Sequence, residues 1–286
     1  MCAGADSEAP GVIHLPFTRE PRGGDLLRGD IRIPEGPPPR SAVIVSHGFK
    51  GFKDWGFLPH LCRKLAGAGH TVVSFDFSRN GVGASGGEVT ELERFASNTL
   101  TVELEDLLYV LEEVLDRELL PRAPRRVGLL GYGRGGAQSI LSAAEEPRVA
   151  ALVTWAAPSH FDRWSNETRG AWREAGRVWV LNQRSGRAMP LDVTLLDDFE
   201  RNRERLDVRS AARRVAAPWL IVHGEEDVTV YPEDARELVR HAGSGRLVTV
   251  AGAGHTLEST HPFEGESPPL RQAVEATVAH FARHLA

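Results

Sequence analysis

The stretch Gly131-Tyr132-Gly133-Arg134-Gly135-Gly136 follows a short apolar run, Arg126–Leu130 (RVGLL), and opens a helical pattern over Arg134–Ala144. A near-continuous apolar run of this length is typical of a parallel strand that is buried on both faces. The glycines lack the Gly-Lys-Ser/Thr of a phosphate-binding loop, and they are not set in a full dinucleotide-binding unit. The stretch therefore predicts a tight strand–turn–helix junction rather than a nucleotide site.

Outward from this junction, short β-branched runs alternate with amphipathic segments of helix length. This alternation predicts a parallel sheet covered by helices on both faces. Leu27–Ile33 instead alternates apolar and polar residues, which favours a half-exposed antiparallel strand at the sheet edge. The other predicted strands are Ser41–Ser46, His70–Phe77, Val149–Trp155, Trp219–His223 and Arg246–Val250. The other predicted helices are Gly56–Ala66, Glu91–Leu119, Pro232–His241 and Leu270–Leu285.

The composition restricts the class of protein. The chain has 286 residues, 41% of them hydrophobic, which is enough to bury one sizeable core. A formal net charge of −5 gives no overall attraction to nucleic acid or to anionic membranes. The cysteines, Cys2 and Cys62, form neither a CxxC pair nor a metal-ligand cluster, so we expect no disulfide framework and no metal. The N-terminus does not resemble a secretory signal, and no run approaches about twenty apolar residues, so we expect a cytoplasmic protein without a membrane span.

One segment breaks the alternation of strands and helices. About sixty residues separate the strand that ends near Ala156 from the strand that begins near Trp219, which is too many for a simple loop. Within this segment, RVWVLN and RAMPL flank QRSG, whose Gly186 suits a hairpin turn. We therefore expect an inserted lid at residues 158–216 and a core made of residues 1–157 and 217–286.

Three further motifs each follow a predicted strand: HGFKG at residues 47–51, HGEED at 223–227 and GAGH at 252–255. In the first, a backbone N–H of the glycine-rich turn can point at an oxygen that gains negative charge. The alternative is a turn that needs glycine only for its dihedral angles. The non-functional interpretation of the second motif is an acidic loop. For the third motif it is a structural or exposed residue, which a lone histidine more often is.

Taken together, these motifs resemble the α/β-hydrolase superfamily, whose nucleophile elbow, Gly-x-Ser-x-Gly, precedes the acid and the histidine along the chain. The resemblance covers most of residues 41–286. It implies an α/β-hydrolase fold, with a mostly parallel eight-stranded sheet flanked by helices and the lid with its β-hairpin inserted. It also implies Asp227 as the triad acid, with Glu226 as a competitor, and His255 as the general base. The oxyanion hole would be formed by the backbone N–H groups of Phe49 and Arg134.

In this resemblance Gly133 stands where the family has its nucleophilic serine, so no acyl-enzyme can form there. Loss of the nucleophile costs roughly 10⁶ in turnover in well-studied serine hydrolases. Glycine also relieves the roughly 1–3 kcal/mol of backbone strain that a serine carries at an elbow. We find no substitute nucleophile among the residues considered, Tyr132, Ser139, Ser142 and Cys62.

Four explanations of Gly133 stay open. The chain could be a pseudoenzyme that binds acyl-type ligands, or an enzyme that uses Asp227 and His255 as a general-base dyad. It could also be an esterase inactivated by engineering, or carry a sequence variant. Another histidine, His261, competes with His255 for the role of base. We rank an esterase-like scaffold with impaired serine catalysis first, the dyad enzyme second and a ligand-binding module third.

The HGFKG motif and the lid length are similar to those of small bacterial acyl esterases of the feruloyl or cinnamoyl kind, and of the catalytic domains of acyl-peptidases. This similarity implies a small-molecule acyl or aryl ester-like ligand and no cofactor. The lid aromatics would line the pocket beside Gly133, with Trp164 and Trp179 as substrate contacts, or would form the lid's own small core. They are Phe161, Trp164, Trp172 and Trp179. The sequence implies no particular oligomeric state.

Overall fold

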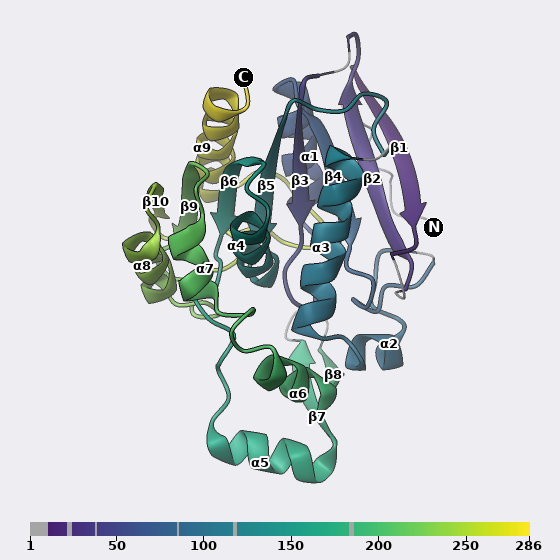
Figure 1. The fold of residues 1–286 in the computed structure, drawn as a ribbon, viewed down its shortest axis with the longest axis vertical. Coiled ribbons are helices and arrows are strands. Elements are labelled where there is room, and N and C mark those ends of the chain that lie inside the picture. Colours follow the sequence, from purple (N-terminus) through teal and green to yellow (C-terminus); the bar gives the residue numbers. More distant parts are fainter. Residues whose placement is uncertain (1–10, 22–24, 38, 85, 117–118, 183–185) are drawn as a thin grey trace.

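Eight strands form one sheet in the order β1-β2-β4-β3-β5-β6-β9-β10 in this computed structural model, which describes residues 11–21, 25–37, 39–84, 86–116, 119–182 and 186–286 (Figure 1). Strand β2 is antiparallel to both of its neighbours, and the other pairs are parallel. The predicted fold, a mostly parallel eight-stranded sheet, is confirmed. The strands of this sheet are β1 (Val12–Arg19), β2 (Leu27–Pro34), β3 (Ser41–Ser46), β4 (Thr71–Asp76), β5 (Arg126–Tyr132), β6 (Val149–Trp155), β9 (Trp219–Gly224) and β10 (Gly245–Val250).

The edge of the sheet differs from the prediction. Strand β2 is antiparallel, as expected, but it lies inside the sheet, because β1 pairs with its outer side. Two of the polar residues that suggested exposure, Asp30 and Arg32, are buried and paired. Lys53 Nζ lies 2.6 Å from Asp30 Oδ2, and Arg32 donates to Ser74 Oγ at 3.2 Å. In this strand, the alternation of polar and apolar residues therefore reflects buried polar pairs and not exposure of one face to solvent.

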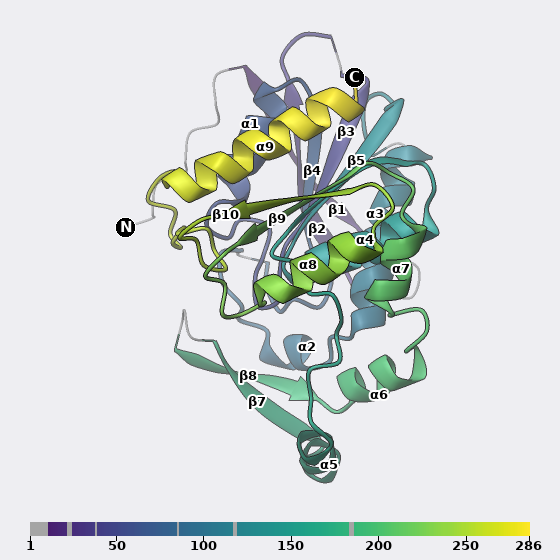
Figure 2. The ribbon, with the colours of Figure 1, turned by 90° about the vertical axis from the view of Figure 1, so that its left-hand side faces the viewer.

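Helices cover both faces of the sheet (Figures 1 and 2). Helices α1 and α9 pack together on one face, while α3, α4, α7 and α8 cover the other. The segment predicted as one helix over Glu91–Leu119 is two helices, because the chain turns at Ser97–Thr99 and Thr99 caps the second helix by accepting from Val102 N–H. The helices outside the predicted insertion are α1 (Leu58–Gly67), α2 (Leu92–Ala96), α3 (Leu100–Leu115), α4 (Arg134–Glu145), α8 (Pro232–His241) and α9 (Pro268–His284).

The segment predicted as an insertion, residues 158–216 and called the insertion below, lies mostly beyond the carboxyl ends of the parallel strands (Figure 1). It contains α5 (Asn166–Ala175), the antiparallel hairpin of β7 (Arg177–Asn182) and β8 (Arg187–Asp192), and α6 (Thr194–Arg201). Its last helix, α7 (Val208–Arg214), packs against α4 and α8. The first three residues of the predicted QRSG turn, 183–185, lie outside the described residues, as does Cys2.

Within the described part of the chain, no helix combines the length and the apolar character needed to cross a membrane.

Candidate functional site

The turn between β5 and α4 places Gly133 at the carboxyl edge of the sheet. Its backbone adopts φ +54° and ψ −124°, a region that side-chain-bearing residues rarely occupy. Its N–H donates to Trp155 O at 2.8 Å, and its carbonyl accepts from Gly136 N–H at 2.9 Å. A Cβ atom built on Gly133 would lie 3.6 Å from His255 Nε2 and 3.6 Å from Gly48 Cα. The turn is thus fixed by backbone hydrogen bonds and still has room for a side chain.

Next to this turn, Asp227 and His255 form a hydrogen-bonded pair, with Asp227 Oδ2 at 2.7 Å from His255 Nδ1. The other carboxylate oxygen, Oδ1, accepts the backbone N–H groups of Thr229 and Val230 at 2.8 and 2.9 Å. Burial acts to raise the pKa of Asp227, but hydrogen bonds from His223 and His255 outweigh it and hold that pKa well below its ordinary range. Because the carboxylate stays ionised, His255 Nδ1 carries a proton. The other ring nitrogen, Nε2, lies on the side of Gly133 and can act as a base there.

The loop after β3 brings Gly48 and Phe49 to the same place. The ring of His47 fixes this loop through two hydrogen bonds. Its Nε2 accepts Phe77 N–H at 3.2 Å, so its Nδ1 carries the proton and donates to Gly48 O at 2.9 Å. Burial lowers the pKa of His47 to about 4, so the ring is neutral near pH 7. Sequence analysis quoted His47 within the motif but gave it no role.

Neither of the two expected oxyanion donors is occupied. The backbone N–H groups of Phe49 and Arg134 make no hydrogen bond within the described residues, and both residues line the same cavity as Gly133. The side chain of Arg134 is held by other groups, since it donates to Glu103 Oε1 at 2.6 Å and stacks on the Phe49 ring, 4.0 Å from its centroid. The N–H groups are therefore available to an incoming oxygen.

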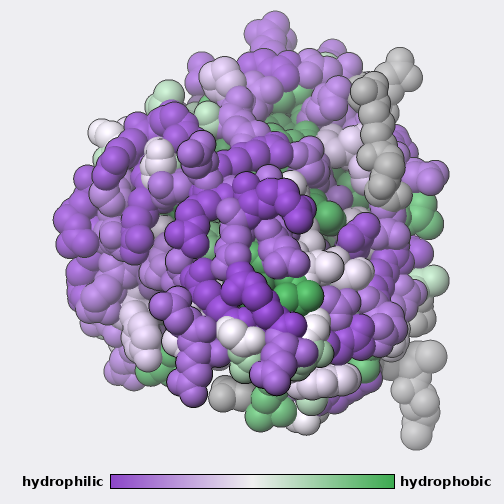
Figure 3. Space-filling model, turned by 60° about the horizontal axis from the view of Figure 1, so that its bottom comes forward, coloured by the Kyte–Doolittle hydropathy of each residue, from purple (hydrophilic) through white to green (hydrophobic). Residues whose placement is uncertain are grey.

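A cavity of about 710 Å³ opens beside these groups, and the insertion supplies part of its wall. Figure 3, viewed from this end of the molecule, shows hydrophobic residues in a hollow bordered by hydrophilic ones. Phe161 and Trp164 line the cavity, as expected. Trp172 instead belongs to the small core of the insertion: it is fully buried, and Trp164 packs against both it and Phe199.

The prediction for Trp179 needs correction. Trp179 does not line the cavity and is 59% exposed. It lies on β7, where side chains alternate between the two faces, so its neighbours Val178 and Val180 face inward and Val180 takes the place in the cavity wall.

Comparison with known proteins identifies the family. A family model described as "Alpha/beta hydrolase family" matches residues 43–268. The chain belongs to the alpha/beta hydrolase family. Among curated proteins, the "2,6-dihydropseudooxynicotine hydrolase" of Paenarthrobacter nicotinovorans is 30% identical over 202 residues, which make up 69% of this chain and 47% of that protein. The chain thus spans about half the length of this relative.

Solved structures share the fold of this hydrolase-family chain. Est1E from Butyrivibrio proteoclasticus, in a structure with ferulic acid bound, has a TM-score of 0.71 at 18% identity, and the match covers 94% of this chain and 98% of that one. The dienelactone hydrolase from Anabaena variabilis has a TM-score of 0.64 at 18% identity, with coverages of 96% and 100%. At these identities the likeness shows the fold alone.

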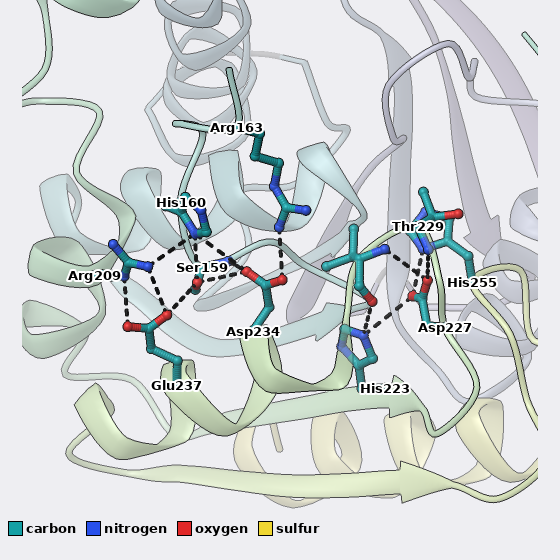
Figure 4. A network of polar contacts seen from close by, with 11 residues as sticks. Ser159, His160, Arg163, Arg209, His223, Asp227, Thr229, Asp234, Glu237 and His255 are labelled. Atoms are coloured by element: carbon teal, nitrogen blue, oxygen red, sulfur yellow. Dashed lines mark hydrogen bonds and ion pairs between the residues drawn. The ribbon is translucent and has the colours of Figure 1, made fainter. Parts of the chain in front are cut away.

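A second polar network lies beside the Asp227–His255 pair in this alpha/beta hydrolase (Figure 4). Its centre is Asp234 on α8, which accepts the backbone N–H of Ser159 at 2.8 Å and its hydroxyl at 2.7 Å. Asp234 thereby ties the start of the insertion to α8. Sequence analysis missed this network, since its residues lie far apart in the chain. Its members are Ser159, His160, Arg163, Arg209, Asp234 and Glu237.

The competing residues lie elsewhere. Glu226 is exposed, and the ring of His261 accepts a backbone N–H outside the cavity wall. Ser139 and Ser142 are fully buried in α4, and Cys62 is buried in the core, where burial raises the pKa of its thiol. The described residues hold no cluster of three or more His, Cys, Asp or Glu that could bind a metal ion.

Proposed function

We propose that this chain is an esterase-like member of its family that takes carboxylic esters or amides into the cavity, and that Gly133 stands at the position of the nucleophile. The observation that carries the proposal is the place of a Cβ on Gly133, 3.6 Å from His255 Nε2, while Asp227 still holds the imidazole at 2.7 Å. Serine hydrolases need this spatial order of nucleophile, base and acid. Without an oxygen at position 133, the acyl-enzyme route is blocked.

The remaining groups of the cavity are suited to binding an ester. The free N–H groups of Phe49 and Arg134 would hold the carbonyl oxygen. Phe161 and Trp164 would contact an aryl or medium-chain acyl group, with the insertion acting as a lid. The bound ferulic acid in the Est1E structure is consistent with such a ligand class. A cytoplasmic location, the lack of a nucleic-acid or membrane partner and the lack of a cofactor stay predictions from the sequence.

A nucleophile trap tests this proposal directly. A fluorophosphonate forms a covalent adduct with an activated serine, so Gly133→Ser should gain one adduct, detected by mass spectrometry. The chain with Gly133 should gain none. Labelling of the unmodified chain at another residue would overturn the assignment of position 133, and so would a folded Gly133→Ser protein that resists labelling.

A second candidate function follows from the intact Asp227–His255 pair. In it, His255 Nε2 removes a proton from water, the water oxygen attacks the ester carbonyl, and the protonated imidazole returns the proton to the departing alcohol. The C–O bond breaks without a covalent intermediate. This candidate requires slow hydrolysis by the unmodified chain that is lost in His255→Ala. Ligand binding with no hydrolysis in either protein would favour a non-catalytic binding module instead.

A further inference from the structure

The charged side chains of the cavity wall are all positive. Among the described lining residues, Lys50, Arg134 and Arg163 carry cationic side chains, and none of the lining residues is acidic. The acids that pair with the two arginines, Glu103 and Asp234, lie behind the wall. Each of these ion pairs therefore presents its positive end to the cavity. Such a surface favours a ligand with a negative group.

The cationic side chains of the wall differ in what they can still bind. The guanidinium of Arg134 is held by Glu103 and the Phe49 ring. The ammonium of Lys50 donates to Leu181 O at 3.1 Å. In contrast, Arg163 donates through Nη2 to Asp234 Oδ2 at 2.8 Å and makes no other hydrogen bond among the residues that the structure describes. Its side chain is 33% exposed, so the rest of the guanidinium is open to a ligand.

The contacts of Asp234 fix the direction of Arg163. While Oδ2 of Asp234 accepts from Arg163, Oδ1 accepts the N–H and the hydroxyl of Ser159, which is fully buried. The carboxylate is thus held on both oxygens, and Figure 4 shows it between Ser159 and Arg163. A guanidinium held in this way has less side-chain freedom to lose when it binds a second carboxylate.

His160 adds a donor on the same wall. Arginine cannot accept a hydrogen bond, so the 3.2 Å contact from Arg209 makes His160 Nδ1 an acceptor. Burial lowers the pKa of His160, which keeps the ring neutral near pH 7. Its single ring proton therefore sits on Nε2, for which no partner is found in the described part of the chain. His160 lines the cavity, so an N–H donor stands beside Arg163.

We propose that the ligand of this cavity carries a free carboxylate, which the guanidinium of Arg163 binds with the help of His160 Nε2–H. The substrate class is then the half-ester or half-amide of a dicarboxylic acid, with one end at Arg163 and the ester or amide carbonyl at the Phe49 and Arg134 N–H groups. Arg163 is a specificity-determining residue in this arrangement. The ester part rests on the proposed function, whereas the carboxylate part rests on the charges of the wall.

Binding of two matched ketones tests the inference without any turnover. The probes are 4-acetylbenzoate and its neutral isostere 4-acetylbenzamide, measured by calorimetry on the unmodified chain, on Arg163→Met and on Arg236→Met. Arg236 is the control, because it is an exposed arginine on the same helix as Asp234 and does not line the cavity. We expect the unmodified chain to prefer the carboxylate by at least about tenfold, the strength of a charge-assisted hydrogen bond.

We expect Arg163→Met to remove this preference by lowering the affinity for the benzoate far more than that for the benzamide, while Arg236→Met keeps the preference. Equal affinity of the unmodified chain for both probes would overturn the inference. So would no binding of either, or an Arg163→Met protein that loses both affinities equally. Hydrolysis by the Gly133→Ser variant reports separately on the proposed function. Hydrolysis of neutral methyl benzoate without a carboxylate preference rejects only the inference, and a carboxylate preference without hydrolysis rejects only the ester proposal.

Discussion

Within the turn at residues 131–136, three glycines differ from the fourth. A Cβ on Gly131 would lie 2.3 Å from Gly135 O, and one on Gly135 would lie 2.3 Å from His47 O. At Gly136 it would meet the Ala157 side chain at 2.7 Å. At Gly133 the nearest atoms are 3.6 Å away, an ordinary contact distance. The three flanking glycines are required by the close approach of neighbouring atoms, while Gly133 is favoured only by its positive φ. The turn has the space that a side chain at its tip would need.

The largest expected effect is a gain of activity in Gly133→Ser. The hydroxyl would lie next to His255 Nε2, and hydrolysis of short acyl or aryl esters should rise by up to roughly 10⁶ over the unmodified chain. The measurement is the initial rate across an ester panel. His255→Ala in the Gly133→Ser background is the control and should return the rate to background. An unchanged rate in a folded Gly133→Ser protein would show that the space at the tip has another use.

The next effect concerns the acid. In the Gly133→Ser background, Asp227→Asn should lower kcat by about 10⁴, as the corresponding change does in a serine protease, since the amide no longer selects the required imidazole tautomer. Thr229 and Val230 N–H groups can still bind the remaining oxygen, so the loop should keep its shape. The comparison of kcat with thermal unfolding separates the two effects. A loss of less than tenfold would remove Asp227 from the triad.

Substitutions of Gly135 and Gly133 should also differ in their effect on the free energy of unfolding, but less strongly than the changes in activity above. Gly135→Ala places a methyl group against a carbonyl at 2.3 Å, so the backbone must move, and we expect a loss of at least about 3 kcal/mol. Gly133→Ala meets no close atom and should cost about 1–3 kcal/mol through its positive φ. Urea unfolding measures both. Equal losses would contradict the steric difference between the two positions.

The smallest effect is the pH dependence of stability. The folded-state pKa of Asp227 is lowered, so its contribution is present above its unfolded pKa, about 4, and is lost as the pH falls below it. Asp227→Asn should therefore flatten the acid limb of an unfolding titration. Asp106 is a control of opposite sign. Burial raises its pKa to about 7, so its contribution to stability falls as the pH rises from about 4 to about 7. An acid limb unchanged by Asp227→Asn would contradict the strong pairing with His255.

Much of the fold followed from local patterns. Runs such as Ser41–Ser46 and Val149–Trp155 could be located because strands buried on both faces are continuously apolar. The motif loops followed because each comes directly after a predicted strand, and the structure brings Asp227 and His255 together at 2.7 Å. Strand order cannot be derived this way, and the outer strand β1 was not predicted at all.

The remaining differences depend on tertiary contacts. The burial of β2 depends on Lys53 and Ser74, which pair with Asp30 and Arg32 from other segments. The direction of a side chain on β7 depends on which face of the hairpin meets the core, and the sequence does not state this for Trp179. The network around Asp234 joins residues up to 78 positions apart, as in the hydrogen bond between Ser159 and Glu237. Spacing along the chain carries no signal for such contacts.

The unused space at residue 133 also bears on how the chain could change over generations. A glycine codon that ends in a pyrimidine becomes a serine codon through a single base substitution. Under the proposed function, that substitution would meet no close atom and would find His255 Nε2 already facing it. The same substitution at Gly135 would force the backbone apart. Under the proposed function, a single point mutation at this codon is therefore enough to supply the nucleophile.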